Sequence, residues 1–386
     1  MYVLSFGSSQ GFERHLMKIL SVFGTRPEAV KMAPVVRALT QTQSIESRVC
    51  VTAQHRQMLD QVLDLFNIKP DYDLDLMRDD QTLPALSAAI FTHLDPVLEK
   101  FKPDWVLVQG DTTTVAITAL LSYYRRIRVG HVEAGLRTHD KWQPFPEEIN
   151  RRVAGVTADL HFAPTEWARK NLLRENTPEQ AIVVTGNPVI DALKFVGERS
   201  LPDEIKQLLE KLKIGGQRLL LVTAHRRENF GEPLEAICLA LKELASRGDV
   251  EIVYPVHLNP NVQKSAHRIL KDVPHVTLLP PLDYLPLVHL MKRSTLILTD
   301  SGGIQEEAPT FGVPVLVLRE VTERPEGVEA GTLKLVGTDA GRIVEEATRL
   351  LDDPSAYAAM ARAANPFGDG HAAEKIVRAL LDYRTP

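Results

Sequence analysis

The chain has 386 residues, 44% hydrophobic and 25% charged, which is the composition of a globular protein too long for one ordinary core. Its formal net charge of −5 argues against a nucleic-acid partner, because such partners are held by a broad basic face. No window of the sequence is long and apolar enough to span a membrane. Cys50 and Cys238 lie far apart in apolar surroundings, and we interpret them as reduced thiols of a cytoplasmic protein, neither disulfide partners nor metal ligands.

The first 16 residues differ from the rest of the chain. They have neither the basic head nor the long apolar stretch of a signal peptide, and regular patterning begins only at Met17. We interpret residues 1–16 as a disordered extension, with a functional arm as the alternative.

From Met17 onward, short apolar runs that end in glycine or polar residues alternate with helical patterns. The runs cover residues 18–24, 106–111, 127–133 and 182–187, and the pattern restarts with residues 219–225, 251–257, 276–281, 296–303 and 313–319. Buried strands separated by amphipathic helices predict parallel sheets covered on both faces. The fold class is therefore α/β.

The restart near residue 219 predicts two doubly wound, Rossmann-like domains. We place them at residues 17–187 and 188–365, and we expect the helix of the last segment, 366–386, to pack back on the N-terminal domain. Ligands of such sheets bind outside the carboxyl ends of the strands. Two domains that face each other with these ends therefore predict a deep interdomain cleft.

Two motifs of the first domain follow strand ends. In FGTRPEAVK, Pro27 stands in the first turn of a predicted helix, a position that suits proline. Arg26 and Lys31 of this motif either reach an anionic ligand or are solvated cations, and their spacing does not decide. In QGDTTT, Asp111 follows a buried strand. The Gly110-Asp111-Thr112 turn either only caps the next helix or also provides Asp111 as a catalytic carboxylate.

The stretch from residue 131 to residue 152 concentrates ionisable side chains between regular elements. Glu133 follows a predicted strand, and Glu147 and Glu148 begin a helix after two prolines. Acids in a first helical turn are often only partners of the helix dipole, and we assign that role to Glu148 and a solvated surface to the arginines at the end of the stretch. The prolines and aromatic residues favour a fixed loop. A carboxylate held in place and partly desolvated is the kind of group that removes a proton from carbon.

In the second domain, the motif TDSGGIQEEAPTFG joins a buried strand to a short helix. The backbone at Gly302 and Gly303, after Ser301, allows close approach of a ligand, and the N–H groups of the helix start favour an anion. Glu307 lies about one turn further on, where a carboxylate accepts hydrogen bonds from ribose hydroxyls, and Arg324 adds charge on the far side of a diphosphate. The alternative is an ordinary tight turn between strand and helix.

His225 ends a predicted strand in the motif TAHRREN. A single histidine is often structural, but one that lies among arginines at a strand end also suits neutralisation of a leaving phosphate or donation of a proton. Both interpretations stay open on the residues alone.

Taken together and in this order, FGTRPEAVKMAPV, QGDTTT, HVEAGLRT, PEEINR, TAHRREN and TDSGGIQEEAP resemble the non-hydrolysing UDP-N-acetylglucosamine 2-epimerases, over about residues 17–384. The resemblance implies the two-domain fold of many nucleotide-sugar glycosyltransferases, known as GT-B, with the active site in the cleft. It implies interconversion of UDP-GlcNAc and UDP-ManNAc through elimination of UDP to 2-acetamidoglucal and its re-addition. It also implies no cofactor and no metal, a homodimer, and a role in cell-envelope polysaccharide biosynthesis.

The resemblance also implies roles for individual residues. The acid/base carboxylates are Asp111, Glu133 and Glu147, and His225 acts near the leaving diphosphate. The residues that hold UDP are Arg26, Lys31, Ser301, Gly302, Gly303, Glu307 and Arg324, with the uracil against the backbone around Leu282. A second, activating UDP-GlcNAc site corresponds to Gln54, Gln57, Arg226 and His257. The family's arginine before the QTL segment is Asp80 here, which argues against identical activation.

Three other functions were weighed against the non-hydrolysing epimerase. A hydrolysing epimerase releases free ManNAc and UDP, and the whole-length match favours the non-hydrolysing type instead. A glycosyltransferase of the same fold does not usually need so many carboxylates, and no acceptor-docking face stands out. A non-catalytic sensor of nucleotide sugars is expected to lose the carboxylates while it keeps the Ser-Gly-Gly turn, whereas this chain has both.

Overall fold

The structure is a computed structural model, and it describes residues 16–52, 56–78, 80–211 and 217–384. The predicted extension lies outside these residues except for Leu16, and so does Gln54. The described chain forms two compact units. The first runs to Val132 and includes Ile149–Leu160, and the second comprises Glu133–Glu148 and the chain from His161 onward.

The first sheet has seven strands in the order β3-β2-β1-β4-β5-β6-β7. These strands are β1 Met17–Phe23, β2 Ile45–Val51, β3 Tyr72–Asp73, β4 Trp105–Gln109, β5 Arg128–Val132, β6 Leu160–Ala163 and β7 Ile182–Val184. The pairs β1–β2, β1–β4, β2–β3, β4–β5 and β6–β7 are all parallel. A parallel, doubly wound sheet is what the alternating pattern predicts.

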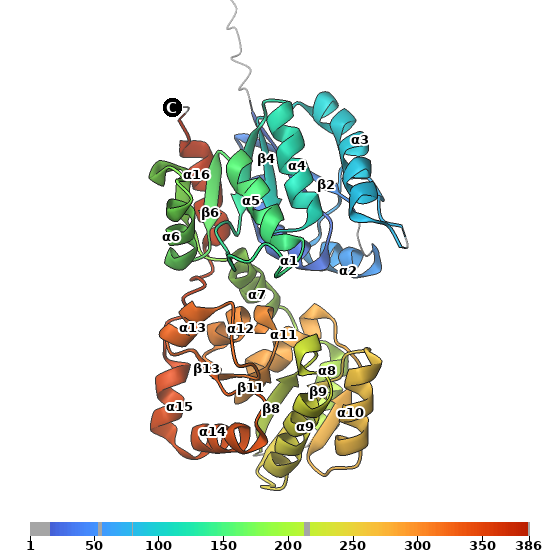
Figure 1. Cartoon of the computed structure of the whole chain (residues 1–386), viewed down its shortest axis with the longest axis vertical. Coiled ribbons are helices and arrows are strands. Elements are labelled where there is room, and N and C mark those ends of the chain that lie inside the picture. The colour runs from blue at the N-terminus through green and yellow to red at the C-terminus, as the bar shows by residue number, and fades with distance from the viewer. Residues whose placement is uncertain (1–15, 53–55, 79, 212–216, 385–386) are drawn as a thin grey trace, which may run out of the picture. The chain divides into compact units, whose positions relative to one another are not determined.

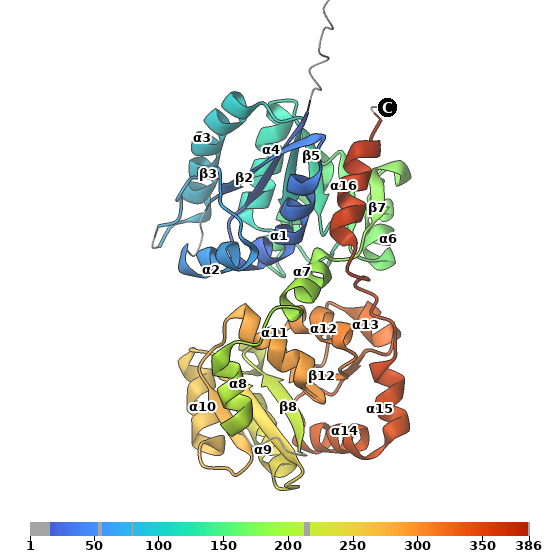
Figure 2. The ribbon, with the colours of Figure 1, turned by 180° about the vertical axis from the view of Figure 1, so that it is seen from behind.

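Helices flank this sheet on both faces. They are α1 Arg26–Gln41, α2 Arg56–Phe66, α3 Leu83–Phe101, α4 Thr113–Tyr124, α5 Glu147–Thr157 and α6 Glu166–Arg174, with a short 3-10 helix, η1, at Glu179–Ala181. Within the first unit, α3 packs on α4 across one face (Figure 1), and α1 packs on α2 across the other (Figure 2). Their apolar sides bury the strands from both faces, as in other doubly wound sheets.

The second sheet has six strands in the order β10-β9-β8-β11-β12-β13, all parallel where they pair. They are β8 Arg218–Thr223, β9 Val250–Pro255, β10 Val276–Leu279, β11 Leu296–Thr299, β12 Val315–Val317 and β13 Leu333–Leu335. The inner residues of β8, β9, β11 and β12 are fully buried in one apolar core shared with the covering helices, and β10 packs against this core with partly buried residues. The two sheets confirm the predicted fold class of two Rossmann-like parallel sheets.

The second half of the chain has its own set of helices. They are α7 Pro188–Gly197, α8 Asp203–Lys211, η2 Arg227–Asn229, α9 Glu232–Ala245, α10 Pro260–Leu270, α11 Tyr284–Arg293, α12 Gly302–Glu307, η3 Ala308–Phe311, α13 Pro325–Glu329, α14 Ala340–Asp352, α15 Pro354–Ala361 and α16 Ala372–Asp382. Helix α9 packs on α10 and α14, and α11 packs on α7 and α8. Helix α16 packs on α7, where the carboxylate of Asp191 accepts the backbone N–H groups of Ala372 and Ala373 at 3.2 and 2.9 Å.

Each of the nine predicted strands is present, but the predicted runs extend into the polar turns that follow. Four strands were not predicted, namely β2, β3, β6 and β13. β2 is the instructive case because polar residues occupy the second to fourth positions of its sequence, IESRVCV. Arg48 in this strand donates hydrogen bonds to the hydroxyl of Tyr72 at 2.9 Å and to the carboxylate of Glu46 at 2.7 Å. Local partners thus satisfy side chains that the sequence pattern treats as a loop signal.

Candidate active site

The turn before α1 is built around a buried carboxylate. Thr25 caps the helix, Pro27 lies in its first turn as predicted, and Glu28 completes the capping box. Oε2 of Glu28 accepts the backbone N–H groups of Gly24 and Thr25 at 2.8 and 2.7 Å. Arg26 and Lys31 are half-buried on the first two turns of α1. Glu28 therefore fixes the turn from which these two cations extend.

Glu28 also reaches the turn after β4. Its Oε1 accepts a hydrogen bond from the hydroxyl of Thr112 at 2.6 Å, next to Asp111. Burial raises the pKa of Glu28, against the hydrogen bonds from Thr112, Gly24 and Thr25, which lower it. The two predicted motifs of the first unit are thus joined by a residue that the sequence analysis did not single out.

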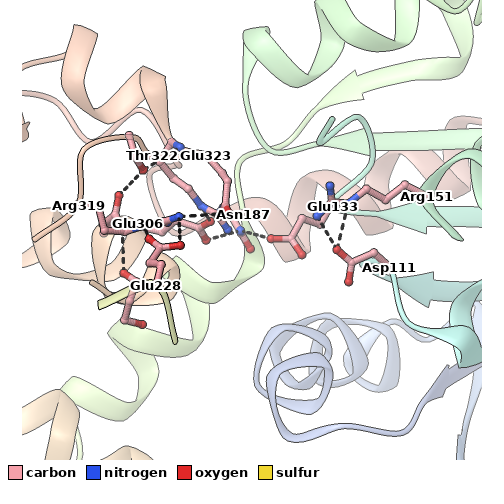
Figure 3. A network of polar contacts seen from close by, with 12 residues as sticks. Asp111, Glu133, Arg151, Asn187, Glu228, Glu306, Arg319, Thr322 and Glu323 are labelled. Atoms are coloured by element: carbon pink, nitrogen blue, oxygen red, sulfur yellow. Dashed lines mark hydrogen bonds and ion pairs between the residues drawn. The ribbon is translucent and has the colours of Figure 1, made fainter. Parts of the chain in front are cut away.

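Asp111 follows β4, and it is not the N-cap of the next helix. That position belongs to Thr112, whose hydroxyl accepts the backbone N–H of Val115 at 3.4 Å. The predicted Gly110-Asp111-Thr112 turn therefore does cap the helix, but through Thr112 and not through Asp111. Its Oδ2 instead accepts hydrogen bonds from Nε and Nη2 of Arg151 at 3.0 and 2.8 Å (Figure 3). The assignment of Arg151 to a solvated surface is therefore also wrong, because its guanidinium holds this carboxylate.

Glu133 directly follows β5 and is buried, with 6% of its surface exposed. Its backbone φ of 62° lies in the left-handed region, which costs a residue with a Cβ about 1–2 kcal/mol. Such strain is concentrated at functional positions. Oε1 of Glu133 accepts a hydrogen bond from the side-chain amide of Asn187 at 2.9 Å (Figure 3). The predicted strand-end acid is therefore a buried carboxylate with a fixed polar partner.

The same amide connects Glu133 to a second buried carboxylate. Nδ2 of Asn187 also donates to Oε2 of Glu306 at 2.9 Å. Oε1 of Glu306 accepts a hydrogen bond from Nε of Arg324 at 2.7 Å. Burial acts to lower the pKa of Arg324, but the charges of Glu306, Glu133 and Glu323 outweigh it and raise that pKa. Arg324 is thus a permanently charged group beside two buried carboxylates.

The loop before α5 is internally bonded, as its prolines and aromatic residues predict. Glu148 is fully buried, and its carboxylate accepts the backbone N–H groups of Thr138 and His139 at 3.1 and 3.3 Å. The interpretation of Glu148 as an ordinary helix-start residue is therefore wrong, since it holds the loop. Glu147 begins α5, and within the described chain its buried Oε2 has no hydrogen-bond partner. One oxygen of Glu147 is therefore not engaged in holding the fold.

His225 follows β8 beside a fully buried carboxylate, Asp300. Oδ2 of Asp300 accepts the backbone N–H groups of His225 and Arg226, both at 2.8 Å. The amide of Asn229 donates to the same oxygen at 3.0 Å. Burial lowers the pKa of His225, the charge of Asp300 opposes this, and His257 and Arg226 lower it further. The rings of His225 and His257 stack with centroids 5.4 Å apart, so the predicted catalytic histidine touches a residue predicted for the second site.

Helix α12 begins at Gly302, after Ser301. A Cβ at Gly302 would lie 3.5 Å from Nη2 of Arg226 and 3.5 Å from Cζ of Arg324. Two guanidinium groups thus approach the backbone of the Ser-Gly-Gly turn. Two positively charged groups beside a glycine backbone are a suitable environment for a diphosphate.

The predicted ribose and uracil residues are also close in the fold. Glu307 is buried, and its Oε2 accepts a hydrogen bond from the hydroxyl of Tyr284 at 3.0 Å. Tyr284 is the first residue of α11, two positions after the half-buried Leu282. A side chain that the sequence analysis missed therefore links the two segments.

The described residues lack two features. No group of three or more histidine, cysteine, aspartate or glutamate side chains there is arranged to hold a metal ion. No helix among them is long and apolar enough to cross a membrane.

Two doubly wound parallel sheets, with acidic and basic side chains at their strand ends, define a Rossmann-like α/β protein of the GT-B type. Residues 37–381 match the family model described as UDP-N-acetylglucosamine 2-epimerase, and the chain belongs to this family.

Similar proteins cover almost the whole chain. The UDP-N-acetylglucosamine 2-epimerase of Yersinia pestis is 57% identical over 373 residues, which are 95% of this chain and 99% of that protein. The protein of the same name from Escherichia coli strain K12 is 55% identical over 375 residues, with the same coverage. The structure of the Neisseria meningitidis UDP-GlcNAc 2-epimerase bound to UDP-GlcNAc is 51% identical, with a TM-score of 0.86 over 95% of this chain and 100% of that one. The Methanocaldococcus jannaschii enzyme in complex with UDP-GlcNAc and UDP is 35% identical, with a TM-score of 0.77 over 95% and 99%.

Proposed function

We propose that this protein interconverts UDP-GlcNAc and UDP-ManNAc without hydrolysis. In this reaction a carboxylate takes the proton from C2 of the sugar, a double bond forms between C1 and C2, and the C1–O bond breaks with its electron pair on the β-phosphate oxygen. UDP then adds back to C1 of the 2-acetamidoglucal while C2 is protonated on the other face. The observation that carries the proposal is the buried, amide-held carboxylate of Glu133 at a strand end, in a chain that matches this family over nearly its whole length.

The proton-transfer roles fall to Asp111, Glu133 and Glu147. The three carboxylates have different environments. Asp111 accepts hydrogen bonds from a guanidinium and Glu133 accepts one from an amide, whereas one buried oxygen of Glu147 bonds to no described residue. Two faces of the sugar must exchange protons, so at least two positioned acid/base groups are needed. The differing partners are a means of giving these carboxylates different proton affinities.

The nucleotide would be held in the second unit. Arg324 and the backbone of Ser301, Gly302 and Gly303 bind the diphosphate, and Glu307 binds the ribose hydroxyls. The uracil lies against the backbone around Leu282. From the first unit, Arg26 and Lys31 are proposed to contribute charge to the same nucleotide. His225 acts on the leaving diphosphate, with its backbone N–H fixed by Asp300.

A second, activating site for UDP-GlcNAc is proposed at Gln54, Gln57, Arg226 and His257. Arg226 approaches Gly302 of the diphosphate turn, and His257 stacks on His225, which supports communication between this site and the catalytic one. Asp80 stands where the family has an arginine, so we expect weaker activation than in relatives with that arginine.

We propose residues 17–187 and 188–365 as the two domains, with residues 366–386 returning to the first domain. A homodimer and a cytoplasmic location complete the proposal. Both cysteines are free and buried, which fits a reducing compartment.

Separation of the products tests the proposed function. Purified protein is incubated with UDP-GlcNAc, and the sugar products are resolved by chromatography. Formation of UDP-ManNAc as the main product supports the proposal. Free ManNAc with UDP would assign the protein to the hydrolysing epimerases, and release of UDP only after addition of an acceptor sugar would make it a glycosyltransferase.

A further inference from the structure

Four side chains of the second unit form a continuous polar chain from Glu133 to Arg324, and Figure 3 labels its first three members, Glu133, Asn187 and Glu306. The amide nitrogen of Asn187 donates to Glu133 and to Glu306, at 2.9 Å in each case. Glu306 in turn accepts from Nε of Arg324 at 2.7 Å. The chain therefore has a proposed proton-transfer group at one end and a proposed diphosphate-binding group at the other.

The orientation of the central amide is fixed. Oδ1 of Asn187 caps α7 by accepting the backbone N–H of Val189 at 3.1 Å, and its own backbone N–H donates to the carbonyl oxygen of Phe367 at 2.7 Å. Because a backbone donor engages the amide oxygen, the two hydrogens of the nitrogen face the two carboxylates. Asn187 is 1% exposed, so water has little access to this arrangement.

The charges of Glu133, Glu306 and Arg324 in this polar chain are coupled. Glu133 and Glu306 are 6% and 3% exposed, and two buried carboxylates that share one amide repel each other. The guanidinium of Arg324 offsets both charges, and it donates hydrogen bonds to the carboxylates of Glu306 and Glu323. Any ligand that draws on the charge of Arg324 therefore changes the electrostatic environment of Glu133.

We propose that Asn187 and Glu306 are positioning residues that couple proton transfer at Glu133 to departure of the diphosphate. The inference rests on the proposed function. In the direction in which Glu133 takes the C2 proton, the C1–O electron pair moves to the β-phosphate oxygen as the double bond forms. The growing negative charge on the diphosphate attracts the guanidinium of Arg324. Arg324 then offsets the negative charges of Glu306 and Glu133 less, so Glu133 holds the incoming proton more firmly. In the reverse direction the same coupling favours return of the proton as UDP adds to C1.

Asn187→Asp tests the amide link. Aspartate is as good an N-cap as asparagine, so the cap on α7 is retained, but an oxygen replaces the donating nitrogen between the two carboxylates. Loss of a hydrogen bond to a charged group predicts a fall in turnover of about 10- to 100-fold. The loss of turnover should exceed the loss of affinity for UDP, measured by calorimetry, by about tenfold or more.

Asn365→Asp is the matched control. The amide of Asn365 donates to the main-chain oxygen of Glu306 at 3.0 Å and to the hydroxyl of Thr310 at 2.9 Å, so the new charge does not touch the carboxylates of the chain. Its turnover should stay within about threefold of wild type, because it leaves the link between Glu133 and Glu306 intact. An equal loss in both variants would overturn the proposal.

Glu306→Gln provides a second test, because we expect it to change UDP affinity and turnover in opposite directions. Without this carboxylate, Arg324 no longer shares its charge with Glu306, and UDP should bind about threefold or more tightly, while turnover falls about tenfold. General damage to the fold would weaken both. UDP binding that is unchanged or weaker in this variant, or wild-type turnover in Asn187→Asp, overturns the coupling. The UDP affinity of Glu306→Gln can be measured without turnover. Failure of the wild type to form UDP-ManNAc would therefore refute only the proposed function, whereas unchanged or weaker UDP binding in this variant would refute only the coupling.

Discussion

Asp300 offers the sharpest stability prediction, because one buried oxygen carries three hydrogen bonds. Oδ2 accepts the backbone N–H groups of His225 and Arg226 and the amide of Asn229, at 2.8, 2.8 and 3.0 Å. Asp300→Ala leaves these three donors buried without their acceptor. At about 1–3 kcal/mol for each unsatisfied group, and with partial relief from water, we expect a loss of about 3–5 kcal/mol in the free energy of unfolding.

Asp300→Asn separates geometry from charge at this position. The amide oxygen still accepts from the backbone donors, but the hydrogen bonds are no longer charge-assisted, so the expected loss is about 1–2 kcal/mol. The charge of Asp300 also opposes the lowered pKa of His225, so the ring in this variant should stay neutral to lower pH than in wild type. Turnover should fall in both variants because the His225–Arg226 turn is less firmly held.

Urea denaturation followed by circular dichroism measures the loss, and histidine NMR follows the titration of His225. Asp272→Ala is the matched control, since Asp272 is an exposed carboxylate of the same unit, and its effect should stay within about 0.5 kcal/mol. If Asp300→Ala unfolds within about 1 kcal/mol of wild type, the three bonds do not hold the turn and the reasoning is refuted.

Three further variants test other parts of the site. Gly302→Ala places a methyl group at ordinary contact distance, 3.5 Å, from two guanidiniums, so stability should change little while UDP affinity falls in calorimetry; unchanged affinity would remove Gly302 from the diphosphate site. Glu133→Gln should lower turnover by about 10³-fold or more with UDP affinity nearly intact, and lost UDP binding with normal saturated turnover would contradict its role. Glu28→Gln copies the protonated carboxyl. Because burial raises the pKa of Glu28 above 4.5, its stabilising contribution is present at lower pH and is lost as pH rises through the folded-state value. The variant's unfolding free energy in urea, relative to wild type, should therefore increase between about pH 4 and pH 7, and a constant difference would contradict this.

The fold was predictable because its strands are buried on both faces and form continuous apolar runs. The runs at residues 106–111 and 296–303, for example, contain β4 and β11. β2 was missed because Glu46, Ser47 and Arg48 interrupt its apolar pattern, and the partners that satisfy Arg48 become visible only when β3 lies alongside.

The positions of Asp111, Glu133 and His225 just after strands were predictable and are confirmed, whereas their catalytic roles are proposals. The residues that hold these groups were not predictable. Arg151 lies 40 residues from Asp111 in sequence, and Asn187 lies 54 residues from Glu133. A single sequence contains no signal that pairs side chains so far apart, because the pairing depends on the order of strands in the sheet.

Glu148 is a residue for which a rule based on local sequence predicted the wrong role. An acid in the first turn of a helix suits the helix dipole, and that rule gave it a solvated role. Its carboxylate instead accepts two backbone N–H groups of the preceding loop and is fully buried. The chemistry of the stretch from residue 131 to residue 152 thus includes one glutamate that organises the loop and two that are proposed to transfer protons.

Proton exchange at C2 tests the central claim most directly. The protein is incubated with UDP-GlcNAc in D₂O, and the nucleotide sugars are followed by proton NMR. We expect UDP-ManNAc that carries deuterium at C2, because the proton removed by a carboxylate is replaced from a group in exchange with solvent. UDP-ManNAc that retains its original C2 proton throughout, or UDP-GlcNAc left unchanged, would contradict it.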